Sequence, residues 1–336
     1  MTDNTGYRRL IAILITLTVA LVLLALSVGR YSINPLDVIG AVGDKITGAE
    51  GNEAMQNVLF LLRLPRVFAA LLVGAALSVA GAAYQSVFRN PLAAPDLLGV
   101  SQGASVGAAA AILIGAGLPF LQFSAFIGGL VAVFIATSLP RLFRNTSNLM
   151  LVLAGIIVGG LMNSVLGTMK FLAEESTELS AIVFWQMGSL SRVNTSQVLS
   201  ITIPALVCTA IIIIISWRLN ILSLGDQEAK TVGVNVTLMR SITIACASLL
   251  VASTVSISGN VYWIGLVIPN FGRLLTGPDN TKLVPVAALL GGCFMLAIDT
   301  AARTITTMEI PLSILTGIVC VPLYVLLLYR SQVKLI

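Results

Sequence analysis

The chain has 336 residues, of which 57% are hydrophobic and only 10% are charged, and its mean hydropathy is +1.00. A soluble domain needs far more polar surface to stay in water, so this composition excludes a soluble globular protein and predicts a membrane protein. The formal net charge of +5 reflects Lys and Arg placed beside membrane spans and does not indicate nucleic-acid binding.

Apolar windows along the chain predict ten membrane-spanning helices. A helix needs about 20 predominantly apolar residues to cross roughly 30 Å of hydrocarbon, so windows of that length without Asp, Glu, Lys or Arg mark spans. A tenth window, Val261–Thr276, is short and interrupted by proline. We therefore predict an all-α, polytopic membrane protein with a single transmembrane domain over residues 1–336. The spans are helix 1 at about 10–29, helices 2–5 within about 67–169 with a break at Gly117-Leu118-Pro119, helix 6 at about 198–217, and helices 7–10 within about 240–330.

The first window also has a feature of a signal peptide, because Tyr7-Arg8-Arg9 precedes the apolar run. Its uncharged stretch of about 20 residues is longer than the usual 7 to 15 of a cleaved signal, and no clean Ala-x-Ala site follows. These two features favour a retained first helix.

Positive charge is divided unevenly between the two sides of the predicted membrane. With the N-terminus inside and ten spans, 12 of the 19 Lys and Arg residues fall on the inner side. Cytoplasmic segments are enriched in Lys and Arg, so both termini are expected in the cytoplasm. The residues left on the outer side are Arg30, Lys45, Arg63, Arg66, Lys170, Arg192 and Arg303.

The residues that usually carry chemistry are scarce. Cys208, Cys246, Cys293 and Cys320 all fall within predicted spans without metal-like spacing, so they are expected to be apolar packing residues. The sequence has no histidine, the commonest ligand for transition metals, and no G-x-x-x-x-G-K-[ST] phosphate-binding loop. We therefore expect no catalytic residue, metal site or cofactor in this chain. A metal that crosses would cross inside a chelator.

Asp299 is the only acid near the middle of a predicted span. An acid at this depth can serve as a proton or cation site. It can also be a structural partner of Arg303, which lies one helical turn away at i+4. The structural interpretation is favoured, because a proton relay would need more than one such acid.

Two distant segments resemble each other weakly. Ser78-x-x-Gly81-x-x-Tyr84 is followed by Asn90-Pro91, and Ser256-x-x-Gly259-x-x-Tyr262 is followed by Pro269-Asn270. Transporters are often built from inverted repeats whose helices are broken by Pro and Gly near the substrate path. The pattern therefore predicts an inverted internal repeat.

The run 222-LSLGDQEAKTVGVN-235 is a polar segment between helices 6 and 7, on the predicted inner side. Charge between two spans most often belongs to a solvated loop helix. Gly225 and Gly233 bound this segment, and Gly233 is expected to end the helix as its C-cap.

Several runs together carry a resemblance to a known family. In order and spacing they resemble the permease subunits of type II ABC importers, the family that transports iron-siderophores, haem and cobalamin. The resemblance extends from about residue 55 to the C-terminus. The runs are 62-LRLPR-66, 74-GAALSVAGAAYQSVFRNPLAAPDLLGVSQGASVG-107, 153-LAG-155, 185-WQMGSL-190, 224-LGDQEAKTVGV-234, 265-GLVIPNFGRLLTGPDNTKLVP-285 and 309-EIPLSILTGIVCVPLYVLLL-328.

The resemblance implies a permease in a bacterial cytoplasmic membrane (inner or plasma membrane) that pairs with a second permease subunit, identical or paralogous. Two ATP-binding subunits would use ATP and Mg inside, and a substrate-binding protein would deliver cargo outside, so this chain is not expected to be an enzyme. The expected cargo is an Fe(III)-siderophore, with haem or cobalamin as alternatives. A secondary transporter or channel is a distant alternative, which would need more intramembrane acids than this chain has.

The resemblance also implies three residues that dock the external binding protein. Arg63 and Arg66 match an R-L-P-R motif before helix 2, and Arg303 matches an arginine after helix 9; in the family these residues receive carboxylates. Guanidinium groups suit bidentate pairing with carboxylates, which supports the assignment. Anchoring of helix ends at the lipid headgroups is the alternative.

On the inner side the resemblance implies a gate and a helix that couples to the ATPase. The gate candidates at the start of helix 5 are Thr146, Ser147, Asn148 and Leu149, where N-capping by Ser147 or Asn148 is the competing account. Asn270 departs from the family pattern, in which many members carry histidine, so no imidazole chemistry is expected there. The coupling residues are Leu224, Gly225, Asp226, Gln227, Glu228, Ala229, Lys230 and Gly233.

Overall fold

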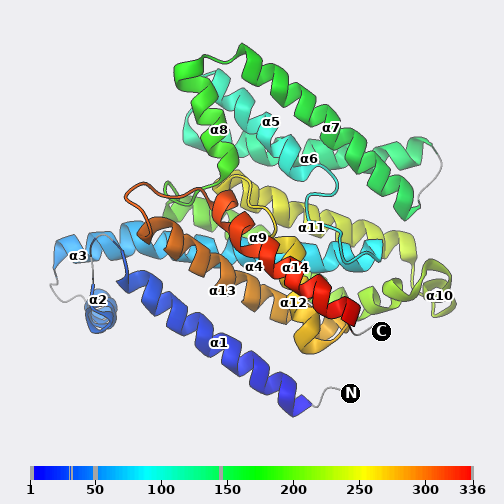
Figure 1. The fold of residues 1–336 in the computed structure, drawn as a ribbon, viewed down its shortest axis with the longest axis horizontal. Coiled ribbons are helices and arrows are strands. Elements are labelled where there is room, and N and C mark those ends of the chain that lie inside the picture. The colour runs from blue at the N-terminus through cyan, green and yellow to red at the C-terminus, as the bar shows by residue number, and fades with distance from the viewer. Residues whose placement is uncertain (1–3, 30, 32, 48–51, 144–146, 334–336) are drawn as a thin grey trace.

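The fold is helical throughout the part of the chain that the structure describes. The structure is a computed structural model that describes residues 4–29, 31, 33–47, 52–143 and 147–333. Figure 1 shows the helices packed side by side as one bundle, with α5 to α8 along one edge and α1 along the other. The helices are α1 (Asn4–Ser27), α2 (Pro35–Thr47), α3 (Glu53–Asn57), the π-helix η1 (Val58–Arg63), α4 (Leu64–Phe88), α5 (Val100–Leu113), α6 (Leu118–Leu142), α7 (Asn148–Leu172), the π-helix η2 (Glu175–Leu179), α8 (Ser180–Met187), α9 (Thr195–Leu224), α10 (Asp226–Thr231), α11 (Val236–Ser258), α12 (Ile264–Thr276), α13 (Asn280–Thr304) and α14 (Leu312–Val333).

The apolar helices correspond to the predicted spans. Within the described residues, 8 helices are long and apolar enough to cross a membrane. The shorter apolar helices α5 and α12 have 14 and 13 residues. At 1.5 Å per residue each is about 20 Å long, less than the roughly 30 Å of a hydrocarbon core. The break predicted at Gly117-Leu118-Pro119 separates α5 from α6. The prediction of an all-α polytopic fold is confirmed.

The second span begins earlier than its predicted start at Val67. Residues 53–88 form one helical run of 36 residues, because η1 joins α3 directly to α4. The N–H of Leu64 donates to the carbonyl of Leu59, five residues back, as a π-turn requires. Pro65 follows directly after this π-turn, at the second residue of α4. The predicted start was too late because Arg63 and Arg66 lie within this helical run, and the spans were predicted from windows without charged residues.

The sixth span is also longer than predicted. Helix α9 continues to Leu224, although the apolar window ends at Trp217. Arg218 ends the window but not the helix, because a long charged side chain near a helix end can reach the membrane interface. Its guanidinium carbon lies 5.2 Å from the centre of the Trp217 ring.

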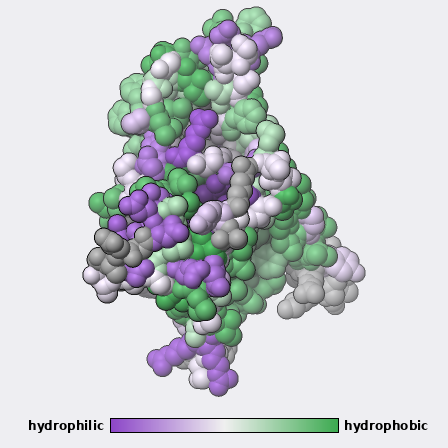
Figure 2. Space-filling model, turned by 90° about the vertical axis from the view of Figure 1, so that its left-hand side faces the viewer, coloured by the Kyte–Doolittle hydropathy of each residue, from purple (hydrophilic) through white to green (hydrophobic). Residues whose placement is uncertain are grey.

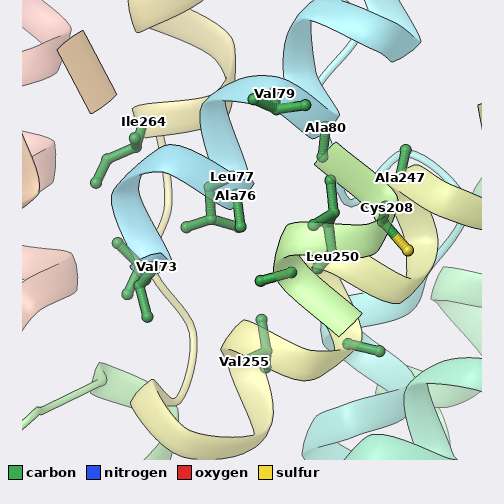
Figure 3. Packing of buried hydrophobic residues seen from close by; sticks show 14 of the residues in the cluster. Val73, Ala76, Leu77, Val79, Ala80, Cys208, Ala247, Leu250, Val255 and Ile264 are labelled. Carbon is green, nitrogen blue, oxygen red and sulfur yellow. The ribbon is translucent and has the colours of Figure 1, made fainter. Parts of the chain in front are cut away.

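Helix α4 is the centre of the bundle and packs against α9, α11, α12 and α13. The most apolar window of the 53–88 run is 78% buried, against 22% for α1. Figure 3 shows side chains of α4, such as Leu77 and Ala80, packed toward Cys208 of α9 and Leu250 of α11. Most of the buried residues of α4 are alanine, glycine or valine. Such small residues let the backbones of neighbouring helices approach closely.

Two glycines of α4 show how close this approach is. A Cβ atom added to Gly81 would lie 1.7 Å from the carbonyl oxygen of Gly265 in α12. A Cβ atom added to Gly74 would lie 2.1 Å from the carbonyl oxygen of Gly291 in α13. Any larger residue at either position would push the helices apart. These contacts fix α4 against the two helices that follow it late in the chain.

The four cysteines are all buried and free of disulfide bonds, which confirms the prediction that they are packing residues. One makes a polar contact, since the hydroxyl of Thr18 in α1 lies 3.0 Å from Sγ of Cys293 in α13. Cys208 of α9 and Cys246 of α11 share a side-chain hydrogen bond, and Cys320 packs with Val267 and Tyr324.

The bundle has two ends, and the predicted site residues divide between them. Helix α1 begins and α14 ends at the same end, near α10; we call this the terminus end (Figure 1). The opposite end contains Arg63, Arg66 and Arg303, and we call it the arginine end. Figure 2 views the arginine end and shows hydrophilic residues near its centre, with hydrophobic residues along its flanks.

Candidate functional site

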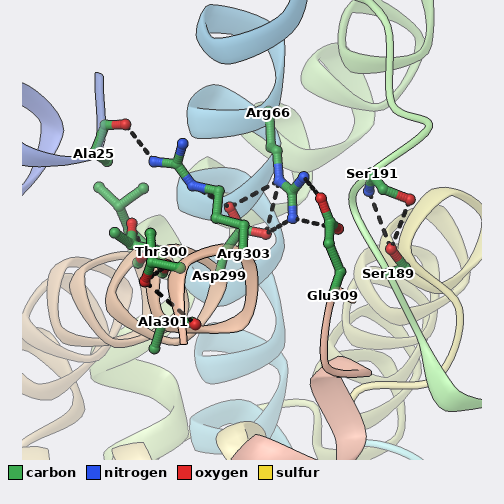
Figure 4. A network of polar contacts seen from close by, with 11 residues as sticks. Ala25, Arg66, Ser189, Ser191, Asp299, Thr300, Ala301, Arg303 and Glu309 are labelled. Carbon is green, nitrogen blue, oxygen red and sulfur yellow. Dashed lines mark hydrogen bonds and ion pairs between the residues drawn. The ribbon is translucent and has the colours of Figure 1, made fainter. Parts of the chain in front are cut away.

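The arginine end is organised around the guanidinium group of Arg66 (Figure 4). Its Nε donates to both carboxylate oxygens of Asp299 at 3.0 Å, and its Nη2 donates to one of them at 3.0 Å. Its Nη1 and Nη2 donate to the two carboxylate oxygens of Glu309 at 2.7 and 2.9 Å. A guanidinium group offers two edges to the bidentate pairing of carboxylates. Both edges of Arg66 are occupied by residues of its own chain.

Asp299 is the buried member of this network. Its side chain is 1% exposed, and its second oxygen lies 3.9 Å from Nε of Arg303, one turn further along α13. A carboxylate withdrawn from water is stable only when charge and hydrogen bonds compensate it. The structural interpretation of Asp299 therefore agrees with its surroundings. Its main partner, however, is Arg66 on another helix rather than Arg303.

Arg63 and Arg303 hold the end of α1. Arg63 Nη1 donates to the carbonyl oxygen of Ser27 at 3.1 Å, and its Nη2 donates to that of Tyr31. Arg303 Nη2 donates to the carbonyl oxygen of Ala25. Carbonyl groups at a helix C-terminus have no partner within the helix and favour a nearby cation. The two arginines therefore have structural partners within the chain, and Arg63 is only 6% exposed.

Two cavities adjoin the network. The first, of about 330 Å³, is lined by Arg63, Arg66, Arg303 and Glu309. The second, of about 450 Å³, lies among the start of α6, α8, the end of α11 and the segment before α14. Glu309 lines both cavities, so it lies between them. The polar residues of the second cavity include Gln122, Ser189, Ser191, Arg192, Gln197, Ser256 and Ser258.

Glu309 is a site residue that the sequence analysis did not single out. It begins the run 309-EIPLSILTGIVCVPLYVLLL-328, but no role followed from that resemblance. The signal that could have found it is the scarcity of charge, since only 10% of the residues are charged. In such a chain, an acid just outside a span and at the same end as three arginines is a candidate partner for one of them. Which arginine it meets depends on helix packing and is not encoded locally.

At the terminus end, α10 forms the short polar helix expected between the sixth and seventh spans. It begins after Gly225 and ends at Thr231, and Gly233 follows two residues later with a φ of +82°, which suits a residue without a Cβ atom. The N–H of Gly233 donates to Lys230 O at 3.0 Å, and the N–H of Val234 donates to Ala229 O at 2.9 Å. These two bonds make a Schellman motif in which Val232 is the C-cap and Gly233 is the left-handed residue after it, so Gly233 terminates the helix as predicted.

One face of α10 packs against the bundle and the other is exposed. Ala229 is fully buried, and it seats the helix against its neighbours. The side chains of Gln227, Glu228 and Lys230 are exposed. Leu224, the last residue of α9, is 73% exposed beside them. Of the residues predicted to couple to an ATPase, Leu224, Gln227, Glu228, Lys230 and Gly233 are exposed, whereas Gly225 and Ala229 are buried.

Asp226 fixes α10 to two other helices. Its carboxylate accepts hydrogen bonds of 3.0 and 2.9 Å from Arg240 of α11, and it lies 3.6 Å from Nη2 of Arg89. Arg89 ends α4 in a left-handed conformation, with φ +52°, which costs a residue with a Cβ atom roughly 1–2 kcal/mol. Sequence reasoning gave no role to Arg89 or Arg240. Both connect α10 to helices that run the length of the bundle.

The gate candidates have ordinary structural contacts where they are described. The Ser147 hydroxyl caps α7 by accepting from the N–H three residues on, at 3.3 Å. Asn148 Nδ2 donates to the carbonyl oxygen of Val87 at 3.0 Å. Leu149 is 70% exposed, and Thr146 lies outside the described residues. The N-capping account explains Ser147, and the gate stays a prediction.

Asn270 connects the two segments that resemble each other in sequence. Its Nδ2 donates to the carbonyl oxygens of Pro91 at 3.0 Å and Leu266 at 2.8 Å, and its Oδ1 accepts from Arg273 at 3.2 Å. These bonds give the amide a packing role between α12 and the segment after α4. The inverted relation of the two segments stays a prediction.

The described residues contain no group of three or more His, Cys, Asp or Glu side chains placed to hold a metal ion. The polar chemistry at the arginine end is instead that of ion pairs. Guanidinium groups bind carboxylates there, and one of the two carboxylates is accessible from outside.

Residues 17–330 match the FecCD transport family. The chain is 36% identical over 327 residues to the molybdate import system permease protein MolB of Haemophilus influenzae, and 97% of each chain is covered. It is 38% identical over 280 residues to a probable iron chelatin transport system permease protein of Helicobacter pylori, covering 83% of this chain and 84% of that one. It also resembles a solved structure described as an inward-facing conformation of a metal-chelate type ABC transporter. That match has a TM-score of 0.87 at 36% identity and covers 96% of this chain and 99% of the other.

Proposed function

This chain belongs to the FecCD transport family and is a membrane permease of an ABC importer, and from this premise we propose that it imports a ferric siderophore delivered by an external binding protein. The observation that carries the proposal is the different construction of the two ends of the bundle. The arginine end has a cluster of cations that binds carboxylates, and the terminus end has an anchored helix with an exposed polar face. The arginine end suits docking of a binding protein with acidic side chains, and the terminus end suits contact with an ATPase subunit.

The proposed mechanism is alternating access without covalent chemistry. A loaded binding protein places its acidic side chains against the arginine end, and the cargo enters the second cavity, which is lined by apolar side chains together with hydroxyl and amide groups. The exposed face of α10 sits in a groove of the ATPase, which is a separate chain that uses ATP and Mg. Movement of α10 reaches α4 and α11 through Asp226, Arg89 and Arg240. The ATPase contact must differ between the two states of the permease, since equal binding would shift nothing.

The proposal places the terminus end in the cytoplasm and the arginine end outside. The excess of Lys and Arg on the terminus side supports this orientation. A second permease subunit, identical or paralogous, completes the pathway, and two ATP-binding subunits attach at the terminus end, in the cytoplasm. The membrane is the bacterial cytoplasmic membrane.

Molybdate is the second candidate cargo. The observation that favours it is the similarity to MolB, which extends over 97% of both chains. Haem and cobalamin remain alternatives that share the same scaffold. Because selectivity lies largely in the external binding protein, transport by the assembled system decides between these candidates.

Competition for uptake tests the proposed cargo. Cells expressing the permease with its ATPase and binding protein, identified from adjacent genes, are expected to accumulate radiolabelled ferric siderophore. Excess unlabelled ferric siderophore should abolish the signal, whereas excess molybdate, haem or cobalamin should leave it unchanged. The matched control is the same cells without the permease. Accumulation of labelled molybdate that a siderophore does not reduce would replace the first candidate by the second.

A further inference from the structure

Glu309 combines two features that the proposed mechanism does not use. It is bonded to Arg66, one of the proposed docking residues, through both of its carboxylate oxygens. It also lines both the cavity beside the three arginines and the cavity proposed to admit cargo. Movement of this side chain would therefore change the lining of both cavities at once.

The two carboxylates on Arg66 differ in accessibility. Asp299 takes the Nε side of the guanidinium group from within α13 and is 1% exposed. Glu309 takes the outer edge, formed by Nη1 and Nη2, and its side chain is 34% exposed. A carboxylate that approaches from outside therefore reaches the edge that Glu309 occupies. It cannot reach the edge held by Asp299 without unpacking the helix.

The segment that carries Glu309 lies at the surface of the arginine end. It connects α13 to α14, and its exposed side chains include Ile305 at 63% and Met308 at 77%. Its backbone is tied near Glu309 by Ile310 N–H, which donates to Ala302 O at 3.1 Å. The N–H of Leu312, at the start of α14, donates to the carbonyl oxygen of Gly188 at 3.0 Å, beside the second cavity. The bidentate ion pair with Arg66 ties the Glu309 side chain to α4, and charge-assisted bonds of this kind are stronger than neutral ones.

We propose that Glu309 is a resident carboxylate that occupies Arg66 until a partner docks, and that the partner's carboxylate replaces it and releases the segment 305–311. This inference rests on the proposed docking of a binding protein at the arginine end. Exchange of one carboxylate for another keeps Arg66 compensated at each stage. It therefore avoids the penalty of leaving a partly buried guanidinium group without an anion. The released segment borders the second cavity, so docking is coupled to opening of the route for cargo.

The charges at the site favour replacement of Glu309 by the partner's carboxylate over binding of that carboxylate beside Glu309. Three guanidinium groups face two carboxylates, and both edges of Arg66 are already filled. A third carboxylate added without displacement would meet Glu309 at short range and be repelled. Displacement removes that repulsion and leaves Glu309 free to move with its segment.

A spin label on the segment tests the release directly. The native cysteines that the structure describes are all buried, so a Met308→Cys variant can be labelled selectively with a nitroxide in the full chain in lipid nanodiscs. Adding Glu309→Gln is expected to increase the mobility of the label without any partner present. The control Glu175→Gln removes an exposed acid at the same end of the bundle and should leave the mobility unchanged. Glu309→Ala serves the same purpose if the glutamine variant does not fold.

Docking provides the second measurement. The affinity of the nanodisc permease for its purified binding protein should rise about two- to five-fold in Glu309→Gln, since the internal competitor is a partly exposed ion pair. In the labelled Met308→Cys protein that keeps Glu309, docking of the binding protein should raise the mobility of the label to the level seen in the Glu309→Gln variant. Unchanged mobility in both Glu309 variants, or weaker docking, would overturn the exchange. If the wild type does not dock at all, the proposed docking function fails, and the mobility measurement without partner still decides whether Glu309 holds the segment.

Discussion

Replacement of Asp299 by alanine is expected to lower the stability of the folded permease by about 3–5 kcal/mol, because it leaves a buried ion-pair network without its central carboxylate. Asp299 is 1% exposed, accepts three hydrogen bonds from Arg66 and lies 3.9 Å from Nε of Arg303. Unfolding of the purified protein in detergent, followed by temperature or denaturant, measures the loss.

The matched control is Asp37→Ala in α2. Asp37 is an exposed acid at the same end of the bundle, and its removal should change the free energy of unfolding by no more than about 0.5 kcal/mol. Asp299→Asn keeps the shape of the side chain but removes its charge, so its stability should lie between those of the wild type and the alanine variant. An Asp299→Ala protein as stable as the wild type would contradict the assignment of Asp299 as the centre of the network.

Replacement of Glu228 by arginine is expected to weaken association with the ATPase subunit by about 30-fold or more. Loss of a partnered charge in an interface costs about 2 kcal/mol or more, and each 1.4 kcal/mol is a factor of ten in affinity. The fold should be intact, because Glu228 is exposed while Ala229 and Asp226 hold α10 to the bundle. Binding of the purified ATPase to the permease in detergent gives the affinity.

Glu175→Arg is the control for this experiment, because it makes the same charge change at an exposed position of the opposite end. It should leave the affinity for the ATPase unchanged. Equal affinity of the Glu228→Arg and wild-type permeases would remove α10 from the proposed coupling surface. A deficit shared with the Glu175 control would instead point to a general effect of net charge.

The three arginines at the arginine end have two kinds of partner. Arg63 and Arg303 bond to carbonyl oxygens at and after the end of α1, and Arg66 bonds to two carboxylates of the same chain. Reversal of any of these charges would therefore disturb the fold as well as docking. Glu309 is the better position for testing docking, because it can be neutralised without removing a cation that the fold uses.

Those parts of the fold that depend on composition alone could be predicted from the sequence. Apolar windows located the spans, and the break before Pro119 fell where Gly and Pro placed it. Helix ends were less predictable, because a charged side chain ends an apolar window without interrupting the backbone hydrogen bonds of the helix. Arg63 interrupted an apolar window, yet it lies within one helical run, and Arg218 likewise lies inside α9.

The site shows the same division between local and long-range information. The sequence pointed to Gly233 as a helix end, which is a local property of backbone conformation. It pointed to Asp299 as a structural acid but paired it with its neighbour in sequence. The true main partner is 233 residues away on α4, and Glu309 is 243 residues from the same arginine. Such pairings are set by the packing of whole helices, which no local pattern encodes.

Transport by the purified system in proteoliposomes tests the central claim most directly. The permease is reconstituted with its ATPase, with ATP and Mg on the α10 side and cargo-loaded binding protein on the arginine side. The account predicts accumulation of radiolabelled cargo that stops when the binding protein is omitted or when the ATPase is replaced by a variant unable to hydrolyse ATP. Accumulation that continues without hydrolysis, driven by an ion gradient alone, would contradict it.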